Sequence, residues 1–409
     1  MATHHAGRRT RLNVDPGSGD PWAQGLRSRH DGRAGSRVGA GRYCPGMRRE
    51  PLRPQATNAV RVAEPWVERP RLHQHPTLPA MRVLLTNDDG IHAPGIRALY
   101  DAITGADHPA RATPGPESDD STQNAGQKPP ILPSDPVGGP GSEVWTVAPE
   151  TVQSATSHGV TFGEPLMARP ARLGILGDRT ARVAGVAVSG RPADCVKVAV
   201  SALWAEKFGR GTKPDLVISG MNAGANVGIN VIYSGTVAAA LEAAFLGIPS
   251  IAVSLHLGPG RPLWDVAAAH ARRAIDRVLD TGLIEPGHCI NINIPRCEAG
   301  EPGDAPAYEH EPQAAGRKPV EPGDHDPYAE MPIVVCPMNT HGLIDAYERR
   351  TSPAGEAYYW PAGGGLDFHA TDPGTDVHEL FARKITVTPL HHDLTAAPEV
   401  VARYRDALH

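Results

Sequence analysis

The sequence MRVLLTNDDGIHAPG, residues 81–95, decides the fold of this 409-residue chain. Residues 82–85 form a short apolar-rich run without Gly or Pro, and Asn87, Asp88 and Asp89 follow soon after, which predicts a buried strand that ends in a turn. Open parallel sheets bind ligands beyond the carboxyl ends of their strands. Two adjacent carboxylates there favour a hard cation such as Mg²⁺, Mn²⁺ or Ca²⁺. The alternative is an Asx-type turn that caps the next helix.

Charge is unevenly distributed along the chain. Residues 1–80 contain 14 Arg, no Lys and 6 acidic residues, a net charge of +8, whereas the whole chain carries −5. Gly, Pro and Arg interrupt every apolar period in this segment, so we expect a disordered tail. A basic arm could contact nucleic acid or an acidic surface. The preferred interpretation is a start codon upstream of a true start at Met81.

The number and spacing of the cysteines, and the lengths of the apolar runs, indicate the cellular compartment of the protein. The five cysteines are odd in number and lack C-x-x-C spacing, so no zinc site is predicted and a reducing cytoplasm is favoured. Cys195 lies in an apolar helical pattern and is expected to be a core residue rather than a nucleophile. No apolar run is suited to a signal peptide or a membrane span. We expect a cytoplasmic protein without a membrane partner and without obligate nucleic acid.

The next segments alternate between regular and irregular patterns. A helix is expected over residues 93–103, with Pro94 at its first position. Residues 105–142 are rich in Pro, Gly, Asp and Ser, and we interpret them as a low-complexity, mobile insertion. Residues 160–167 and 181–188 have strand composition and predict a hairpin.

A polar loop, PETVQSATSHG at residues 149–159, follows a predicted strand over 143–148. Its small hydroxyl residues Ser154, Thr156 and Ser157 could reach a metal or a phosphate. They could equally well form ordinary turn hydrogen bonds.

A second informative stretch is PDLVISGMNAGANVGINVIYSGT, residues 214–236. It predicts a strand over 215–218, an Asn- and Gly-rich loop that contains Asn222, and a helix over 236–246. Glycines let backbone approach a ligand, Asn offers a neutral oxygen, and residues 234–236 at a helix start favour an anion such as phosphate. Neither the Walker loop nor G-x-G-x-x-G is present. A Gly-rich loop that is merely long is the alternative.

The C-terminal part predicts a hairpin with arms at residues 343–350 and 356–360. Its aromatic residues suggest a subunit contact, and the alternative is a local cluster that closes the hairpin itself. The remaining predicted elements are a helix over 266–279, a strand over 289–294, a helix over 376–382 and a strand over 384–388.

The motifs TNDDGIHAPG, VAPE with QSATSH, SGRPADCVK, PDLVISGMNAGANVG, YSGTVAAALEAAFLGIPSIAVS, NINIP and PGTDVHELFARKITVTPL together resemble the SurE family of survival-protein nucleotidases. The resemblance runs in the family's order from Met81 to about Thr395 and is interrupted only by residues 105–142. It implies a Rossmann-like α/β core of three layers with a mostly parallel sheet. It also implies a C-terminal hairpin and helix extension exchanged between subunits of a homodimer or homotetramer.

The same resemblance implies the site. One Mg or Mn ion per subunit is held by Asp88, Asp89, Ser154 and Asn222, of which Asp88 and Asp89 are also the catalytic residues. The substrate and its phosphate are bound by Asn87, Asn222, Ser234, Gly235 and Thr236. Ala155 departs from the family, which usually has Gly there, and a methyl group restricts the loop angles that present Ser154.

The implied reaction is hydrolysis of nucleoside 5′-monophosphates, and of 3′-monophosphates, to nucleoside and phosphate. A metal-bound water is the expected nucleophile, with Asp88 or Asp89 as general base. His92 and His158 could protonate the leaving group, but a place at the cleft rim is preferred. A broad acid phosphatase or exopolyphosphatase and a non-catalytic nucleotide-binding module are alternatives. The expected domains are a tail over 1–80, a phosphatase domain over 81–398 with an oligomerisation hairpin over 340–362, and a tail over 399–409.

Overall fold

The computed structural model describes residues 80–105, 136–173, 184–299, 326–362 and 365–408. Residues 1–79 of the tail expected over 1–80, and most of the insertion expected over 105–142, lie outside the described residues. The end of that insertion is described and packs on the core: Val137 is fully buried, and its N–H donates to the carbonyl of Ile103 at 2.7 Å.

A nine-stranded sheet organises the described residues, with six central strands running parallel. In spatial order its strands are β10 (Ile333–Val335), β13 (Ile385–Leu390), β8 (Cys289–Ile294), β6 (Ser250–Leu255), β5 (Leu216–Ala223), β1 (Arg82–Thr86), β2 (Glu143–Pro149), β4 (Ala184–Val188) and β3 (Ala168–Arg172). The strand β13 runs antiparallel to β8, and β3 runs antiparallel to β4. The expected mostly parallel α/β sheet is confirmed.

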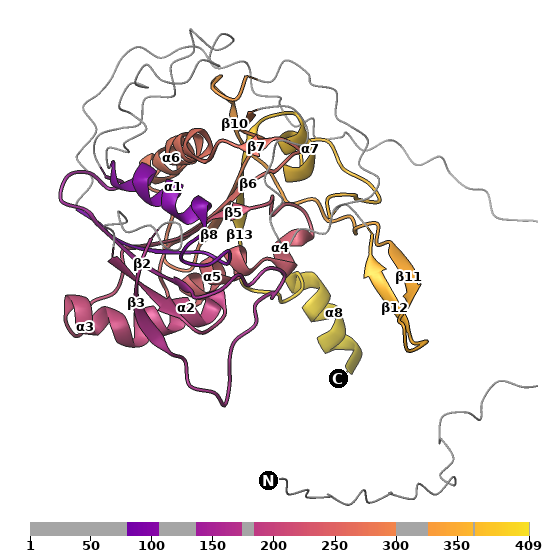
Figure 1. Ribbon diagram of the computed structural model, residues 1–409, viewed down its shortest axis with the longest axis horizontal. Coiled ribbons are helices and arrows are strands. Elements are labelled where there is room, and N and C mark those ends of the chain that lie inside the picture. Colours follow the sequence, from indigo (N-terminus) through magenta and orange to yellow (C-terminus); the bar gives the residue numbers. More distant parts are fainter. Residues whose placement is uncertain (1–79, 106–135, 174–183, 300–325, 363–364, 409) are drawn as a thin grey trace, which may run out of the picture. The chain divides into compact units, whose positions relative to one another are not determined.

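Helices cover both faces of the sheet (Figure 1). On one face lie α1 (Pro94–Thr104) and α6 (Trp264–Asp280). On the other lie α5 (Gly235–Phe245) and α2 (Pro192–Val198), which continues through a π-helical turn, η2 (Ala199–Leu203), into α3 (Trp204–Phe208).

The strand β1 shows how the sequence builds these layers. Val83 and Leu85 pack under α1, whereas Leu84 packs with Trp204 on the opposite face. Side chains alternate between the two faces of a strand, so a continuous apolar run is the pattern of a strand buried on both sides.

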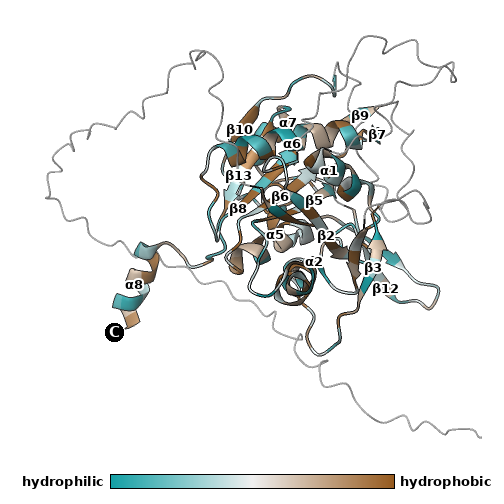
Figure 2. Ribbon diagram, turned by 90° about the vertical axis from the view of Figure 1, so that its left-hand side faces the viewer, coloured by the Kyte–Doolittle hydropathy of each residue, from teal (hydrophilic) through white to brown (hydrophobic). Residues whose placement is uncertain are grey.

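Shorter elements complete the chain. They are α4 (Asn230–Tyr233), α7 (Asp376–Phe381), α8 (Pro398–Leu408), the pair β7 (Arg261–Pro262) with β9 (Glu298–Ala299), and the hairpin of β11 (Tyr347–Thr351) and β12 (Ala357–Pro361). The helix α8 occupies the segment expected as a C-terminal tail. It buries none of its residues, and Figure 2 shows polar and apolar residues mixed along it. No helix in the described ranges is long and apolar enough to span a membrane.

One predicted strand is wrong. The arm expected at residues 160–167 is irregular, and the strand that pairs with β4 is β3, which begins at Ala168. Gly163 has φ of +81°, and Thr161 is held by the carboxylate of Asp194, whose Oδ2 accepts from its hydroxyl at 2.7 Å. A left-handed glycine and a side-chain anchor both interrupt an extended ladder, and composition alone conceals them.

Candidate active site

The candidate site lies where the strand order reverses. From β1 the chain moves to β2 on one side of the sheet, and it later returns to β5 on the other side. Such a switch point opens a crevice beyond the carboxyl ends of the strands. Asp88 and Asp89 follow β1 there, Asn222 lies near the end of β5, and Ser154 follows β2.

Asp88 is held by the first turn of α5. Its side chain is almost fully buried, and Thr236 Oγ1 donates to its Oδ1 at 2.5 Å. Burial raises the pKa of Asp88, and the Thr236 hydroxyl and the backbone N–H groups of Thr236 and Gly235 oppose that rise. A Cβ added to Gly235 would lie 2.9 Å from Asp88 Cβ, so only glycine permits this approach. The start of α5 therefore directs its donors at Asp88.

Asp89 connects the β1 loop to the end of β5. Its Oδ2 accepts the N–H of Ala223 at 2.9 Å, and Ala223 directly follows Asn222. Burial, and after it the charge of Asp88, raises the pKa of Asp89 to about 7. Among the described residues neither carboxylate pairs with a Lys, Arg or His side chain. Two adjacent carboxylates, one buried and one half-buried, are costly without a cation, so their environment suits a bound cation.

Two asparagines add neutral oxygens. Asn222 Nδ2 donates to the carbonyl of Gly224 at 2.7 Å, which leaves Oδ1 as the atom that can bind a ligand. Asn87 is fully buried, and its Nδ2 donates to the carbonyl of Gly90 at 2.9 Å. Its Oδ1 is buried without a hydrogen-bond partner among the described residues. A buried acceptor without a donor is uncommon and suits a site that binds a ligand.

The loop that carries Ser154 is fastened to the other two loops. The N–H of Gln153 donates to the backbone carbonyl of Asp88 at 2.7 Å. Ser157 donates its N–H to the carbonyl of Tyr233 at 3.0 Å and its Oγ to that of Ile232 at 2.8 Å. The side chain of Ser154 is exposed between these anchors.

Ala155, next to Ser154, has φ of +55°. This left-handed conformation suits glycine and strains a residue with a Cβ. The sequence-based concern about Ala155 therefore has a structural cause.

His158 pairs with a glutamate of α5. Its Nε2 lies 2.9 Å from Glu242 Oε2, and Lys197 Nζ lies 3.0 Å from Glu242 Oε1. Burial alone would raise the pKa of Glu242, but the hydrogen bonds from His158 and Lys197 outweigh it and lower the pKa. Glu242 lies two helical turns along α5 from Gly235, so His158 holds its loop against the side of this helix.

A buried asparagine network holds the loop after Asn222, and sequence reasoning missed it. The N–H of Asn226 donates to Asn293 Oδ1 at 2.8 Å, and its Nδ2 donates to Ser254 Oγ at 2.8 Å. Its carbonyl accepts from Asn291 at 2.7 Å and from Asn293 at 3.1 Å. The signal was present: Asn291 and Asn293 alternate with isoleucines in CININI, and buried amides in a strand require partners.

A second anchor of that loop comes from α7. Asp376 Oδ2 accepts the N–H of Gly228 at 2.8 Å, and its Oδ1 accepts the N–H of Asn339 at 2.8 Å. The sequence predicted a helix that begins at this residue, and the structure shows that Asp376 also fixes two distant backbone segments.

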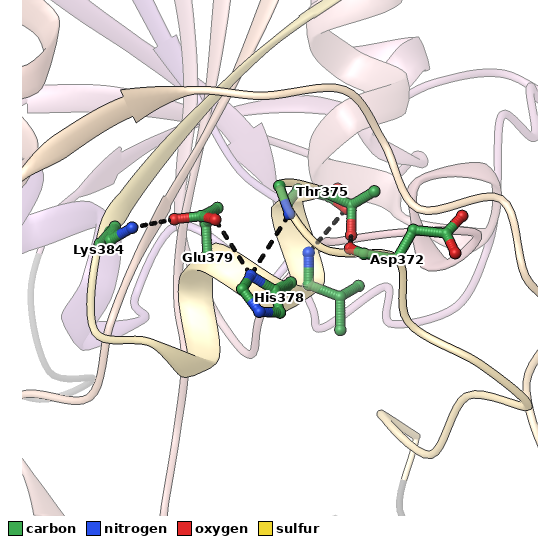
Figure 3. A network of polar contacts seen from close by, with 8 residues as sticks. Asp372, Thr375, His378, Glu379 and Lys384 are labelled. Carbon is green, nitrogen blue, oxygen red and sulfur yellow. Dashed lines mark hydrogen bonds and ion pairs between the residues drawn. The ribbon is translucent and has the colours of Figure 1, made fainter. Parts of the chain in front are cut away.

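The start of α7 is itself held by polar contacts (Figure 3). Thr375 Oγ1 donates to the carbonyl of Asp372 at 2.6 Å, and Glu379 pairs with Lys384 and with His378 Nδ1, which lies 3.1 Å away. The orientation of Asp376 therefore depends on contacts made within its own turn.

The ligand chemistry of the site is that of a hard cation. In the described part of the chain no three or more His, Cys, Asp or Glu side chains gather in a metal-binding group. The candidate set instead combines two carboxylates with hydroxyl and amide oxygens, which suit Mg²⁺ or Mn²⁺. The described cysteines are buried, and burial raises the pKa of the Cys195 thiol, so the expectation of a core residue is confirmed.

Comparisons with known proteins agree with this architecture. The family model described as Survival protein SurE matches residues 83–128 and 131–309. A protein named 5′-nucleotidase SurE from Syntrophobacter fumaroxidans is 36% identical over 315 residues, 77% of this chain and 95% of that protein. Another of that name from Methylobacterium sp. (strain 4-46) is 35% identical over 333 residues, 80% and 100% of the two chains. The crystal structure of the SurE protein from Aquifex aeolicus matches with a TM-score of 0.50 and 26% identity, covering 80% of this chain and 99% of that one.

Proposed function

The chain belongs to the SurE family, and from that membership we propose that it is a metal-dependent 5′-nucleotidase that also accepts nucleoside 3′-monophosphates. Relatives at about 35% identity that carry the name 5′-nucleotidase support the activity. One observation supports the metal most strongly: two adjacent carboxylates, the buried Asp88 and the half-buried Asp89, accept hydrogen bonds from α5 and from the end of β5 and have no cationic partner among the described residues.

In this proposal Asp88, Asp89, Ser154 and Asn222 hold one Mg²⁺ or Mn²⁺. When bound, such a cation neutralises charge on the phosphoryl group. Asn87 and the turn of residues 234–236 bind the phosphate beside Asp88, at the amino end of α5, which favours an anion.

The chain's own groups have separate tasks. Thr236 fixes the orientation of Asp88, and the N–H of Ala223 fixes that of Asp89. Asp88 or Asp89 also accepts a proton from the attacking water in this proposal. Ser234 Oγ accepts the N–H of Val237 at 3.1 Å, so its side chain caps α5 and fixes the turn proposed to hold the phosphate.

The test is phosphate release from AMP and 3′-AMP with Mn²⁺, before and after treatment with a chelator. We expect Asp88→Asn and Asn222→Ala to lose turnover while the exposed-carboxylate control Asp280→Asn retains it. Polyphosphate and a sugar phosphate in the same assay separate a nucleotidase from a broader phosphatase. Undiminished activity in the chelated protein, or in both site variants, would contradict the proposal.

The hairpin within residues 340–362 supports a homodimer or homotetramer. Every residue of β11 and β12 is exposed, including Tyr347, Tyr359 and Trp360. An isolated two-stranded hairpin is at best marginally stable in water, so a second subunit is its expected partner. Light scattering at micromolar concentration tests this, and a monomeric mass would contradict it. We place the protein in the cytoplasm, which the buried free thiols support and cell fractionation tests.

A further inference from the structure

Tyr233 directly precedes the phosphate turn, and its aromatic side chain reaches solvent there. It is 51% exposed, as is the neighbouring Ile232 at 56%, whereas Ser234 and Thr236, which follow it, are buried. Of the exposed aromatic residues in the described ranges, Tyr233 alone lies within three residues of a proposed site residue.

The backbone beneath this ring is fixed from two sides. Ser234 caps α5 through the N–H of Val237. The carbonyls of Ile232 and Tyr233 accept the hydroxyl and the N–H of Ser157, which belongs to the loop that carries Ser154. Tyr233 therefore joins the proposed phosphate turn to a proposed metal loop. A tyrosine has few rotatable bonds, so a ring on a fixed backbone loses little entropy when a ligand packs on it.

In a nucleotide whose phosphate is bound at residues 234–236, the base is joined to that phosphate through a single sugar and therefore lies close to the turn. Consecutive Cα atoms are about 3.8 Å apart, so the exposed side chain of Tyr233 begins one residue from that turn. An aromatic face stacks on any nucleobase because every base has a π-face. We propose that Tyr233 is the stacking surface for the base and so distinguishes nucleotides from other phosphate monoesters. This inference rests on the proposed function and assigns its specificity to one residue.

The experiment compares AMP with ribose 5-phosphate, which has the same ester but lacks the base. Full-length protein with Mn²⁺ is assayed as wild type, Tyr233→Ala, Tyr233→Phe and the control Tyr404→Ala in α8, whose ring is also exposed. For Tyr233→Ala we expect the ratio of kcat/KM for AMP to that for ribose 5-phosphate to fall about five- to twentyfold, mainly through the KM for AMP. Tyr233→Phe and Tyr404→Ala should keep that ratio within about twofold, since phenylalanine retains the stacking face.

The outcomes separate this inference from the proposed function. An unchanged substrate ratio in Tyr233→Ala, whether both substrates are hydrolysed normally or both are impaired equally, overturns the stacking role while the nucleotidase stands. Loss of the ratio in Tyr233→Phe as well overturns it, because the hydroxyl rather than the ring face would then be responsible. A wild-type protein that releases phosphate from neither substrate overturns both. Melting temperatures of the variants verify that each is folded.

Discussion

Replacing Thr236 with Val should weaken cation binding without unfolding the protein. Thr236 is fully buried, and its hydroxyl donates to Asp88 Oδ1 at 2.5 Å. Valine has nearly the same shape and lacks the donor. A hydrogen bond to a charged group contributes about 1.5–3 kcal/mol. At about 1.4 kcal/mol per factor of ten, its loss corresponds to roughly a 10- to 100-fold weaker affinity.

The same change alters the pH dependence of binding. Burial raises the pKa of Asp88, and the Thr236 hydroxyl is the strongest of the groups that oppose that rise. Without it the pKa of Asp88 rises further, and a proton competes with the cation more effectively. The loss of affinity should therefore be larger at pH 6 than at pH 8.

Calorimetric titration of Mn²⁺ into chelator-stripped protein at pH 6, 7 and 8 measures both effects. Thr236→Ser is the matched control, because it keeps the hydroxyl and removes only the methyl group. An unchanged dissociation constant in folded Thr236→Val would refute the reasoning. So would an equal loss in Thr236→Ser, which would assign the effect to the methyl group.

Three further predictions concern stability. In metal-free protein, folding raises the pKa of the Asp89 carboxyl from 3.8 to about 7. Between about pH 4 and pH 7 this carboxyl is therefore protonated in the folded state and ionised in the unfolded state. As the pH rises through that window, the free energy of unfolding of the wild type should fall by up to about 4 kcal/mol relative to that of Asp89→Asn. If urea unfolding gives the same difference between the two proteins at every pH, the prediction is wrong. Glu242→Gln should cost about 1–2 kcal/mol at pH 7, because Lys197 and His158 are partly exposed and regain water. Folding lowers the pKa of Glu242, so the cost of Glu242→Gln should disappear as acid protonates the carboxyl of the wild type. Thermal melts that show the same cost at pH 3.5 as at pH 7 would be inconsistent with the ion pairs. Ala155→Gly should raise the free energy of unfolding by between zero and about 1 kcal/mol. Glycine relieves the strain of the left-handed φ at residue 155, but it also makes the unfolded chain more flexible, which offsets part of the gain. A loss above 1 kcal/mol in chemical denaturation would show that Ala155 is not strained.

The sequence predicted those parts of the fold that depend on local patterns. The apolar-rich run of β1 predicted a buried strand, and the Pro at the start of α1 predicted a helix start. The arm at residues 160–167 failed because a tertiary contact, from Thr161 to Asp194, fixes that segment as a loop. Such contacts leave no periodic signal.

The site divides in the same way. Its loops were predictable, because polar and Gly-rich turns follow apolar strands. Its supports were not, since they join residues far apart in sequence: Thr236 and Asp88 are 148 positions apart, and Asn226 and Asn293 are 67 apart. Only the strand order of the folded sheet makes these pairs neighbours.

The most direct test of the central claim is anomalous diffraction from a crystal grown with Mn²⁺. The account predicts one strong peak at the carboxyl ends of β1 and β5, with oxygens of Asp88, Asp89 and Asn222 within about 2.0–2.6 Å of it. A peak elsewhere, or a peak at this edge of the sheet with Asn222 and either aspartate outside its coordination sphere, would contradict it.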